Sequence, residues 1–137
     1  MNQAVIFYPM TALALMTLMV LLLIPYKRFK ASFARQVTVA DFRYGESSRV
    51  PGDVSLPNRN MMNLLEIPVL FYVLCITLFV TDLVDPAFYY AAWCYFAARF
   101  LHSIVHLTYN NVIHRLTCFA VSNVILTVMW LRFLLVL

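Results

Sequence analysis

The sequence predicts an all-α, polytopic membrane protein, built as a bundle of four transmembrane helices. Of the 137 residues, 64% are hydrophobic and only 12% are charged, whereas soluble domains average about 45–50% apolar and about 25% charged residues. The apolar residues also fall into four runs, each close to the roughly 20 residues that a helix needs to cross a bilayer. Finally, the basic residues gather between the first and second runs, as charges that set membrane topology do.

The whole chain is expected to form one membrane domain, because the four runs and their connections leave no room for a soluble module. The predicted spans cover residues 5–24, 58–80, 87–107 and 116–137.

The connections between the spans follow from their breakers and charges. The first span is expected to end at Pro25, where a basic anchor begins, and residues 26–57 are expected to form a basic loop. Pro68 lies inside the second span, where it removes one backbone hydrogen bond and should kink the helix just beyond Glu66. A short acidic turn at 81–86 then leads into the third span.

The distribution of lysine and arginine predicts the orientation. The loop after the first span holds six basic residues, the turn after the second holds none, and the loop after the third contains Arg115. Because loops rich in lysine and arginine stay in the cytoplasm, the first and third loops should be cytoplasmic and both termini should lie on the opposite side. The net charge of +4 is explained by these flanking residues and does not indicate a nucleic-acid partner; the expected partners are membrane lipids.

Two predicted spans carry polar side chains in positions that are hard to place in lipid. An ionised side chain at bilayer depth costs roughly 3 kcal/mol or more, so it usually faces a bundle interior or a wet cavity. Spacings of three and four residues place each set on one helix face. The two sets are Arg59, Asn63 and Glu66 in the second span, and Arg99, His102 and His106 in the third.

The two polar stripes are expected to meet. At 1.5 Å per residue, Glu66, His102 and Asn123 each lie roughly 12 Å from the cytoplasmic end of their span. Arg99 lies one turn deeper, and pairing with Glu66 would reduce the cost of burying either charge. The pattern predicts a buried polar site in the cytoplasmic half of the bundle.

Each of these residues also has an ordinary structural interpretation. Asn63 and Asn123 could simply hold helices together, and Glu66 with Arg99 could be a structural ion pair. Arg59 and Arg115 lie near the membrane interface, where they could act as anchors. The combined pattern is more specific than any of its members.

The stretch from Arg59 to Pro68 resembles the second-helix signature of the MAPEG family, the membrane-associated proteins in eicosanoid and glutathione metabolism. That signature is an arginine, an asparagine four residues later and a glutamate three residues after that. The segment from Arg99 through His102 and His106 to Arg115 resembles the third helix and following loop of the family. The chain is identified on these residues as a bacterial-type member, which implies the bacterial inner membrane.

The resemblance implies a homotrimer of four-helix subunits that binds glutathione as co-substrate between neighbouring subunits, near the cytoplasmic side. By resemblance, Arg115 is the catalytic residue that stabilises the glutathione thiolate. The implied activity is a glutathione transferase or peroxidase acting on a lipophilic compound. The binding residues implied by the same resemblance are Arg59, Asn63, Glu66, Arg99, His102 and His106.

Two alternatives stay open at this point. His106 stands where eukaryotic enzymes of the family carry a tyrosine, and one branch of the family binds lipid without catalysis, so the chain could be a non-catalytic binder of lipid or fatty acid. Alternatively, His102, His106 and Glu66 could form a two-histidine, one-carboxylate metal or haem site. The cation of Arg99 nearby argues against that option, and no metal is expected.

Overall fold

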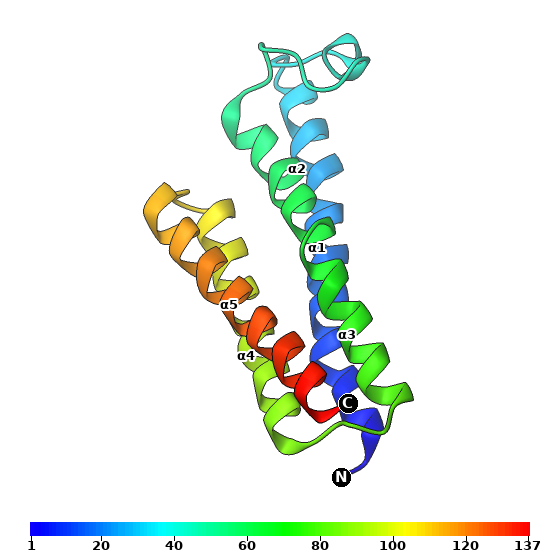
Figure 1. Cartoon of the computed structure of the whole chain (residues 1–137). Coiled ribbons are helices and arrows are strands. Elements are labelled where there is room, and N and C mark those ends of the chain that lie inside the picture. Colours follow the sequence, from blue (N-terminus) through cyan, green and yellow to red (C-terminus); the bar gives the residue numbers. More distant parts are fainter.

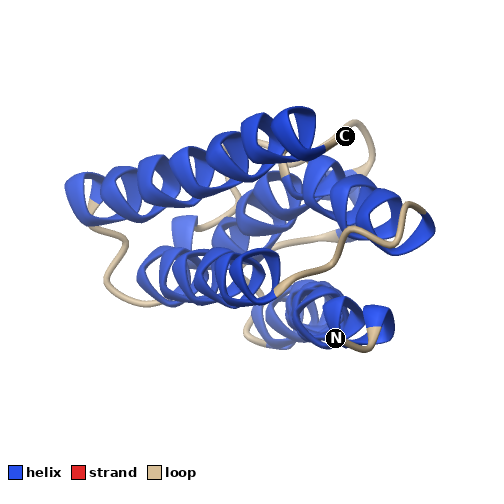
Figure 2. Cartoon of the chain, turned by 60° about the horizontal axis from the view of Figure 1, so that its bottom comes forward, coloured by secondary structure: helices blue, strands red, loops and turns tan.

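The computed structural model describes all 137 residues, and its regular structure consists of helices alone (Figure 2). Four segments run alternately up and down the molecule, namely α1, the pair α2–α3, α4 and α5 (Figure 1). The bounds in chain order are η1 Gln3–Ile6, α1 Phe7–Phe33, η2 Val39–Phe42, α2 Gly52–Leu65, α3 Pro68–Val80, α4 Pro86–Leu107 and α5 Val112–Val136.

The first helix is longer than the sequence predicted. α1 continues through Pro25 to Phe33, so the basic residues after Pro25 extend the helix and do not end it. A proline inside a helix removes a single backbone hydrogen bond, and residues 26–33 contain no glycine or second proline to stop the helix. The expected loop at 26–57 is therefore shorter, because α1 and α2 take both of its ends and leave residues 34–51 as the connection.

The second predicted span is interrupted at Pro68. α2 ends at Leu65 and α3 begins at Pro68, while Glu66 lies between them with φ −87° and ψ −100°. Proline has no backbone N–H to donate to the preceding turn, and its ring would clash with the carbonyl four residues earlier, that of Leu64, in a continuous helix. The expected kink is thus present as a break in the helix, directly beside the polar stripe of α2.

The core lies where α1, α3, α4 and α5 pack against one another near the termini. It contains sixteen buried apolar residues, and the Phe71 ring of α3 stacks on the Tyr95 ring of α4 with centroids 4.4 Å apart. Asp85 caps α4 and forms an ion pair with Arg132 near the end of α5. Both chain termini lie at this end, opposite the 34–51 connection and the α4–α5 turn (Figure 1).

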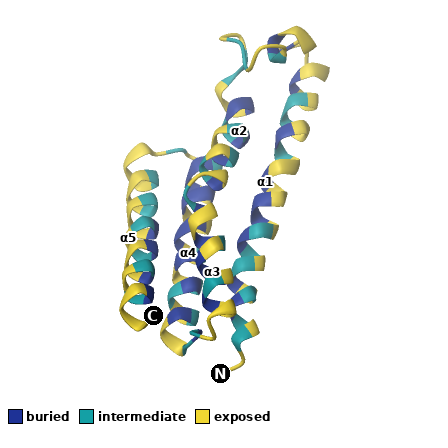
Figure 3. Cartoon of the chain, turned by 45° about the vertical axis from the view of Figure 1, so that its right-hand side comes forward, coloured by how far each residue is buried: buried dark blue, intermediate teal, exposed yellow.

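Three segments are long and apolar enough to cross a membrane: Gln3–Phe33, Gly52–Val80 and Val112–Val136. In each segment, at most 33% of the most apolar stretch of 18 residues is buried inside the chain. The exposed residues of α5 face away from the other helices (Figure 3). Such apolar outer faces suit contact with lipid. α4 contains Arg99, His102 and His106, which make it less apolar, so the count of four spans stays a prediction.

Candidate functional site

A polar pocket of about 460 Å³ opens between α2, α4 and α5. It contains six of the seven residues that the sequence marked as a site, and it adds four apolar residues from α2 and α5. The ten lining residues are Arg59, Met62, Asn63, Glu66, His102, His106, Val112, Arg115, Leu116 and Phe119.

The polar residues of the second segment line this pocket for two reasons. Their spacing places Arg59 and Asn63 on one face of α2, and Glu66 follows directly after the last residue of that helix. Arg59 and Glu66 are exposed within the single chain, and Asn63 is half-buried, with its side-chain amide donating to the Arg59 carbonyl at 3.1 Å. The three ion pairs of the chain involve other residues. The carboxylate of Glu66 and the guanidinium of Arg59 therefore line the pocket without a counter-ion from this chain.

Arg99 lies behind the pocket and does not line it. The side chain is fully buried, and one of its terminal nitrogens donates to the backbone carbonyl of Asn63 at 2.7 Å. The expected Glu66–Arg99 ion pair is therefore not formed. The break after Leu65 leaves carbonyls at the end of α2 without helical donors, and Arg99 donates to one of them; its guanidinium also lies over the Phe119 ring, 5.6 Å from the centroid.

Arg115 organises the α4–α5 side of the pocket. Its guanidinium is 3.3 Å from Nε2 of His106, and its backbone carbonyl is 3.0 Å from Nδ1 of His102. Arginine can only donate and a carbonyl can only accept, so His106 accepts through Nε2 while His102 donates through Nδ1. Neutral His102 then presents the lone pair of Nε2, which has no partner in the chain.

Sequence reasoning missed two asparagines in the turn before α5. Asn110 adopts φ +48°, a left-handed conformation that asparagine tolerates better than most residues, and its Oδ1 accepts from Arg115 at 2.8 Å. Asn111 caps α5 by accepting from the backbone amides of Ile113 and His114 at 3.0 and 3.1 Å. An Asn-Asn pair between two helical runs is the signal that could have found them.

Two further asparagines, Asn60 and Asn123, lie outside the pocket. Asn123, expected at the level of the site, does not line the pocket; the α5 residues that do are Val112, Arg115, Leu116 and Phe119. Asn60 is fully buried and accepts from the Ser103 hydroxyl at 3.3 Å. This bond joins α2 to α4 behind the polar stripe.

The chemistry of the pocket is that of an anion receptor with one acidic corner. Arg59 and Arg115 supply cations, and Glu66 supplies one carboxylate. No group of three or more histidine, cysteine, aspartate or glutamate side chains is placed to hold a metal ion, so the two-histidine, one-carboxylate alternative has no geometric support.

Comparison with known proteins gives one match. The sequence profile of the MAPEG family matches residues 6–135. No curated protein and no solved structure matches the chain. Because the matched region is almost the whole chain and contains every residue of the polar pocket, this protein belongs to the MAPEG family.

Proposed function

We propose that the protein is a glutathione-dependent transferase or peroxidase that acts on a lipophilic compound. The observation that carries this proposal is the charge pattern of the polar pocket, in which two arginines and one carboxylate have no ionic partners in the chain. Glutathione has two carboxylates and one ammonium group. These charges are opposite in sign to the two guanidinium groups and the carboxylate of the pocket. Hydrogen bonds between charged groups are about twice as strong as neutral ones, so the pocket is suited to bind the tripeptide.

Each pocket residue then has a chemical task. Arg59 binds a carboxylate of the tripeptide and Glu66 binds its ammonium group. Arg115 lies near the thiol, because a thiol reacts only as the thiolate and a neighbouring guanidinium lowers its pKa. The thiolate sulfur attacks the electrophilic carbon of the co-substrate, a carbon–sulfur bond forms, and the leaving group departs with the electron pair of the broken bond.

The histidines support these tasks. His106 accepts a hydrogen bond from Arg115 at 3.3 Å and so orients the guanidinium. His102 is nearly fully buried, and the bond of 3.0 Å from its Nδ1 to the Arg115 carbonyl fixes the start of α5 against α4. Asn63 and the buried Arg99 fix the end of α2 through the bond of 2.7 Å between them.

The surroundings of the pocket belong to the same proposal. Arg59 and Glu66 are exposed in the single chain, and in a homotrimer a neighbouring subunit would cover them and complete the site. The pocket lies toward the end of the molecule that carries the basic connection, which the proposal places on the cytoplasmic side of a bacterial inner membrane. The apolar outer faces would let a lipophilic co-substrate arrive from the bilayer.

The test is a titration of the purified protein with glutathione, following the ultraviolet absorbance of the thiolate. We expect thiolate to form with the wild type and to be lost with Arg115→Ala. The matched control is Lys30→Ala, which removes one exposed positive charge from a residue that does not line the pocket and should leave the signal unchanged. Absence of binding by the wild type at millimolar glutathione would reject the proposal.

A second candidate function is supported by the apolar residues that line the same pocket. Met62 of α2 and Val112, Leu116 and Phe119 of α5 line it and could hold the chain of a lipid or fatty acid, with its head group on Arg115 or Arg59. The protein would then be a non-catalytic binding protein. Lipid that co-purifies with the wild type and is not displaced by glutathione would favour this candidate.

A further inference from the structure

A second cavity lies beside the last turns of α1, apart from the polar pocket. Its volume is about 320 Å³, and it has no lining residue in common with the polar pocket. Most of its wall is apolar, and Arg28 is the only charged residue in it. The lining residues are Ile24, Pro25, Arg28, Phe29, Ser32, Val37, Thr38, Val39 and Phe42.

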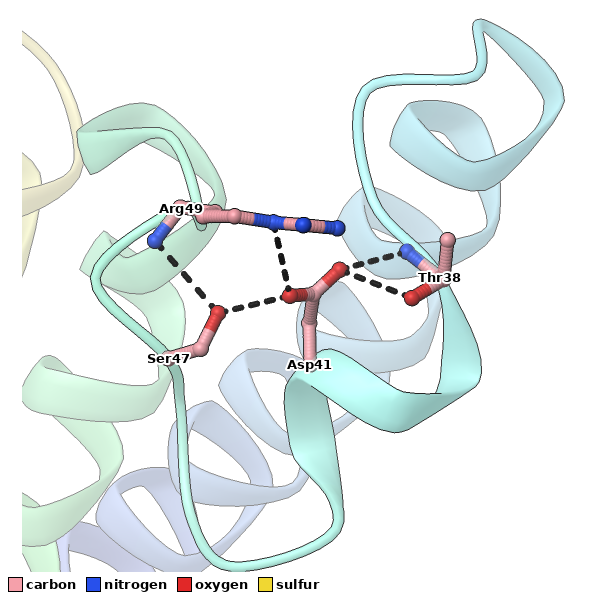
Figure 4. A network of polar contacts seen from close by, with 4 residues as sticks. All are labelled: Thr38, Asp41, Ser47 and Arg49. Carbon is pink, nitrogen blue, oxygen red and sulfur yellow. Dashed lines mark hydrogen bonds and ion pairs between the residues drawn. The ribbon is translucent and has the colours of Figure 1, made fainter.

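A folded turn of the connection builds one wall of this cavity. The carboxylate of Asp41 accepts hydrogen bonds from the backbone N–H of Thr38 at 2.8 Å, the Thr38 hydroxyl at 3.0 Å and the Ser47 hydroxyl at 2.7 Å, and it pairs with Arg49 at 3.4 Å (Figure 4). These contacts, led by the Thr38 amide, lower the pKa of Asp41 from 3.8 to about 2. The turn is thus held by an ionised carboxylate at neutral pH.

The cavity lies at the depth where lipid head groups are expected. Leu23 of α1 and Leu107, the last residue of α4, line one small apolar pocket, so the two lie at the same level. Arg28 lies five residues beyond Leu23, or roughly 7 Å further along the helix. The cavity therefore extends from the end of the apolar part of α1 into its basic part.

Arg28 has donors to spare for a ligand. One terminal nitrogen donates to Oε1 of Glu46 at 3.2 Å, and the guanidinium lies over the Phe42 ring, 4.5 Å from its centroid. The Nε atom is buried and has no acceptor. A guanidinium has five N–H donors, so a single carboxylate leaves most of them free, and the side chain is still 33% exposed.

The charge around the cavity favours an anionic ligand. Residues 26–51 contain six basic and two acidic side chains, and each lysine or arginine near an anionic membrane surface adds to the attraction of the protein for that surface. An apolar cavity with a guanidinium at head-group depth combines the two features that a lipid presents, a chain and an acidic head group.

We propose that this cavity binds one anionic phospholipid of the surrounding bilayer, with an acyl chain between α1 and the connection and its phosphate on Arg28. The proposal does not depend on glutathione binding, because the two pockets are separate. The lipid would contact the 34–51 connection, which contributes no residue to the polar pocket.

The test is native mass spectrometry of the full-length protein in detergent, with equal amounts of phosphatidylglycerol and phosphatidylcholine added. We expect the wild type to retain phosphatidylglycerol preferentially and Arg28→Gln to reduce that affinity about tenfold, as the loss of a charged hydrogen bond predicts. Lys27→Gln removes an equal charge from a neighbouring residue that does not line the cavity, and it should retain most of the affinity.

A second variant tests the apolar part of the cavity independently of charge. Ser32 is exposed and lines the cavity, so Ser32→Trp should fill it without disturbing the core and should also displace the lipid. Equal retention by the wild type, Arg28→Gln and Ser32→Trp would overturn the proposal. So would equal binding of the neutral lipid, or displacement of phosphatidylglycerol by an equimolar free fatty acid or by inorganic phosphate.

Discussion

The polar pocket and the cavity beside α1 each contain an arginine, but the two arginines have different neighbours. Arg115 contacts neutral groups, the side chains of Asn110 and His106. Arg28 pairs with the carboxylate of Glu46. An arginine held by neutral partners keeps its full charge for a ligand, whereas one paired with an acid offers only its remaining donors. We therefore expect the polar pocket to bind its anionic ligand more tightly than the cavity beside α1 binds a phospholipid.

The largest effect is expected at the single acid of the polar pocket. Glu66→Gln keeps the shape of the side chain but removes the charge that would bind the glutathione ammonium group. A hydrogen bond to a charged group contributes about 1.5–3 kcal/mol, so the affinity measured by calorimetry should fall roughly tenfold to a hundredfold.

The ligand supplies the control for this variant. Glutathione acetylated on its amino group has no ammonium, so wild type and Glu66→Gln should bind it with equal affinity. A loss of affinity that is the same for both ligands would mean that Glu66 acts on the fold of the pocket and not on the ammonium group.

A smaller effect is expected from removing one of the two neutral side chains that contact Arg115. Asn110→Gly keeps the left-handed backbone, which glycine adopts freely, but removes the oxygen that accepts from the guanidinium at 2.8 Å. The thiolate fraction of bound glutathione should fall about fivefold at a fixed pH, consistent with about 1 kcal/mol for one hydrogen bond. The pH at which half of the bound thiol is ionised should rise.

Asn111→Ser is the matched control for Asn110→Gly. Serine is as good an N-cap as asparagine, so α5 should start unchanged and the Arg115 contacts should persist. An unchanged pH profile in Asn110→Gly would show that His106 alone suffices to position the guanidinium.

The acid in the connection gives a pH-dependent test of the cavity beside α1. The contacts of Asp41 lower its pKa to about 2, so they contribute stability that is complete above about pH 4 and is lost as the pH falls through about 2. The NMR shift of the Thr38 amide should titrate with a midpoint near 2, and Asp41→Asn should abolish that titration. A midpoint at the ordinary value of 3.8 would mean that the turn is open in solution.

The smallest effect is expected at the ion pair of Arg28. Glu46→Gln releases the guanidinium from its acid, and partly exposed ion pairs contribute about 0–1 kcal/mol. Binding of phosphatidylglycerol should therefore strengthen no more than about fivefold, and added salt should reduce the difference between variant and wild type. Weaker binding in this variant would indicate that Glu46 orients Arg28 for the lipid.

Periodicity and proline chemistry made much of the polar pocket predictable. Spacings of three and four residues placed Arg59, Asn63 and Glu66 on one face of a helix, and Pro68 marked the break beside them. The motif that contains these residues also pointed to the family that the comparison confirmed. These features are local, so a short stretch of sequence suffices to determine them.

The partners of the buried charges could not be predicted in the same way. Depth along a helix placed Glu66 near Arg99, but Arg99 donates to the Asn63 carbonyl, because the break in the helix leaves that carbonyl available. The role of Asn110 depends on a left-handed residue in a turn, and the length of α1 depends on packing of its last turns, such as Ala31 against Val37 and Val54, which offsets the cost of Pro25. These outcomes depend on tertiary packing, on turn conformation and on which backbone acceptors a helix end leaves free, and spacing alone describes none of them.

The gap at Glu66–Ile67 also separates the two halves of this segment in register. In a continuous α-helix, one inserted residue turns everything beyond it by about 100°. Here α2 ends before Glu66 and α3 restarts at Pro68, where it carries Phe71 to its stack on Tyr95. The break therefore lets the polar face of α2 and the core face of α3 take orientations that one continuous helix would not allow.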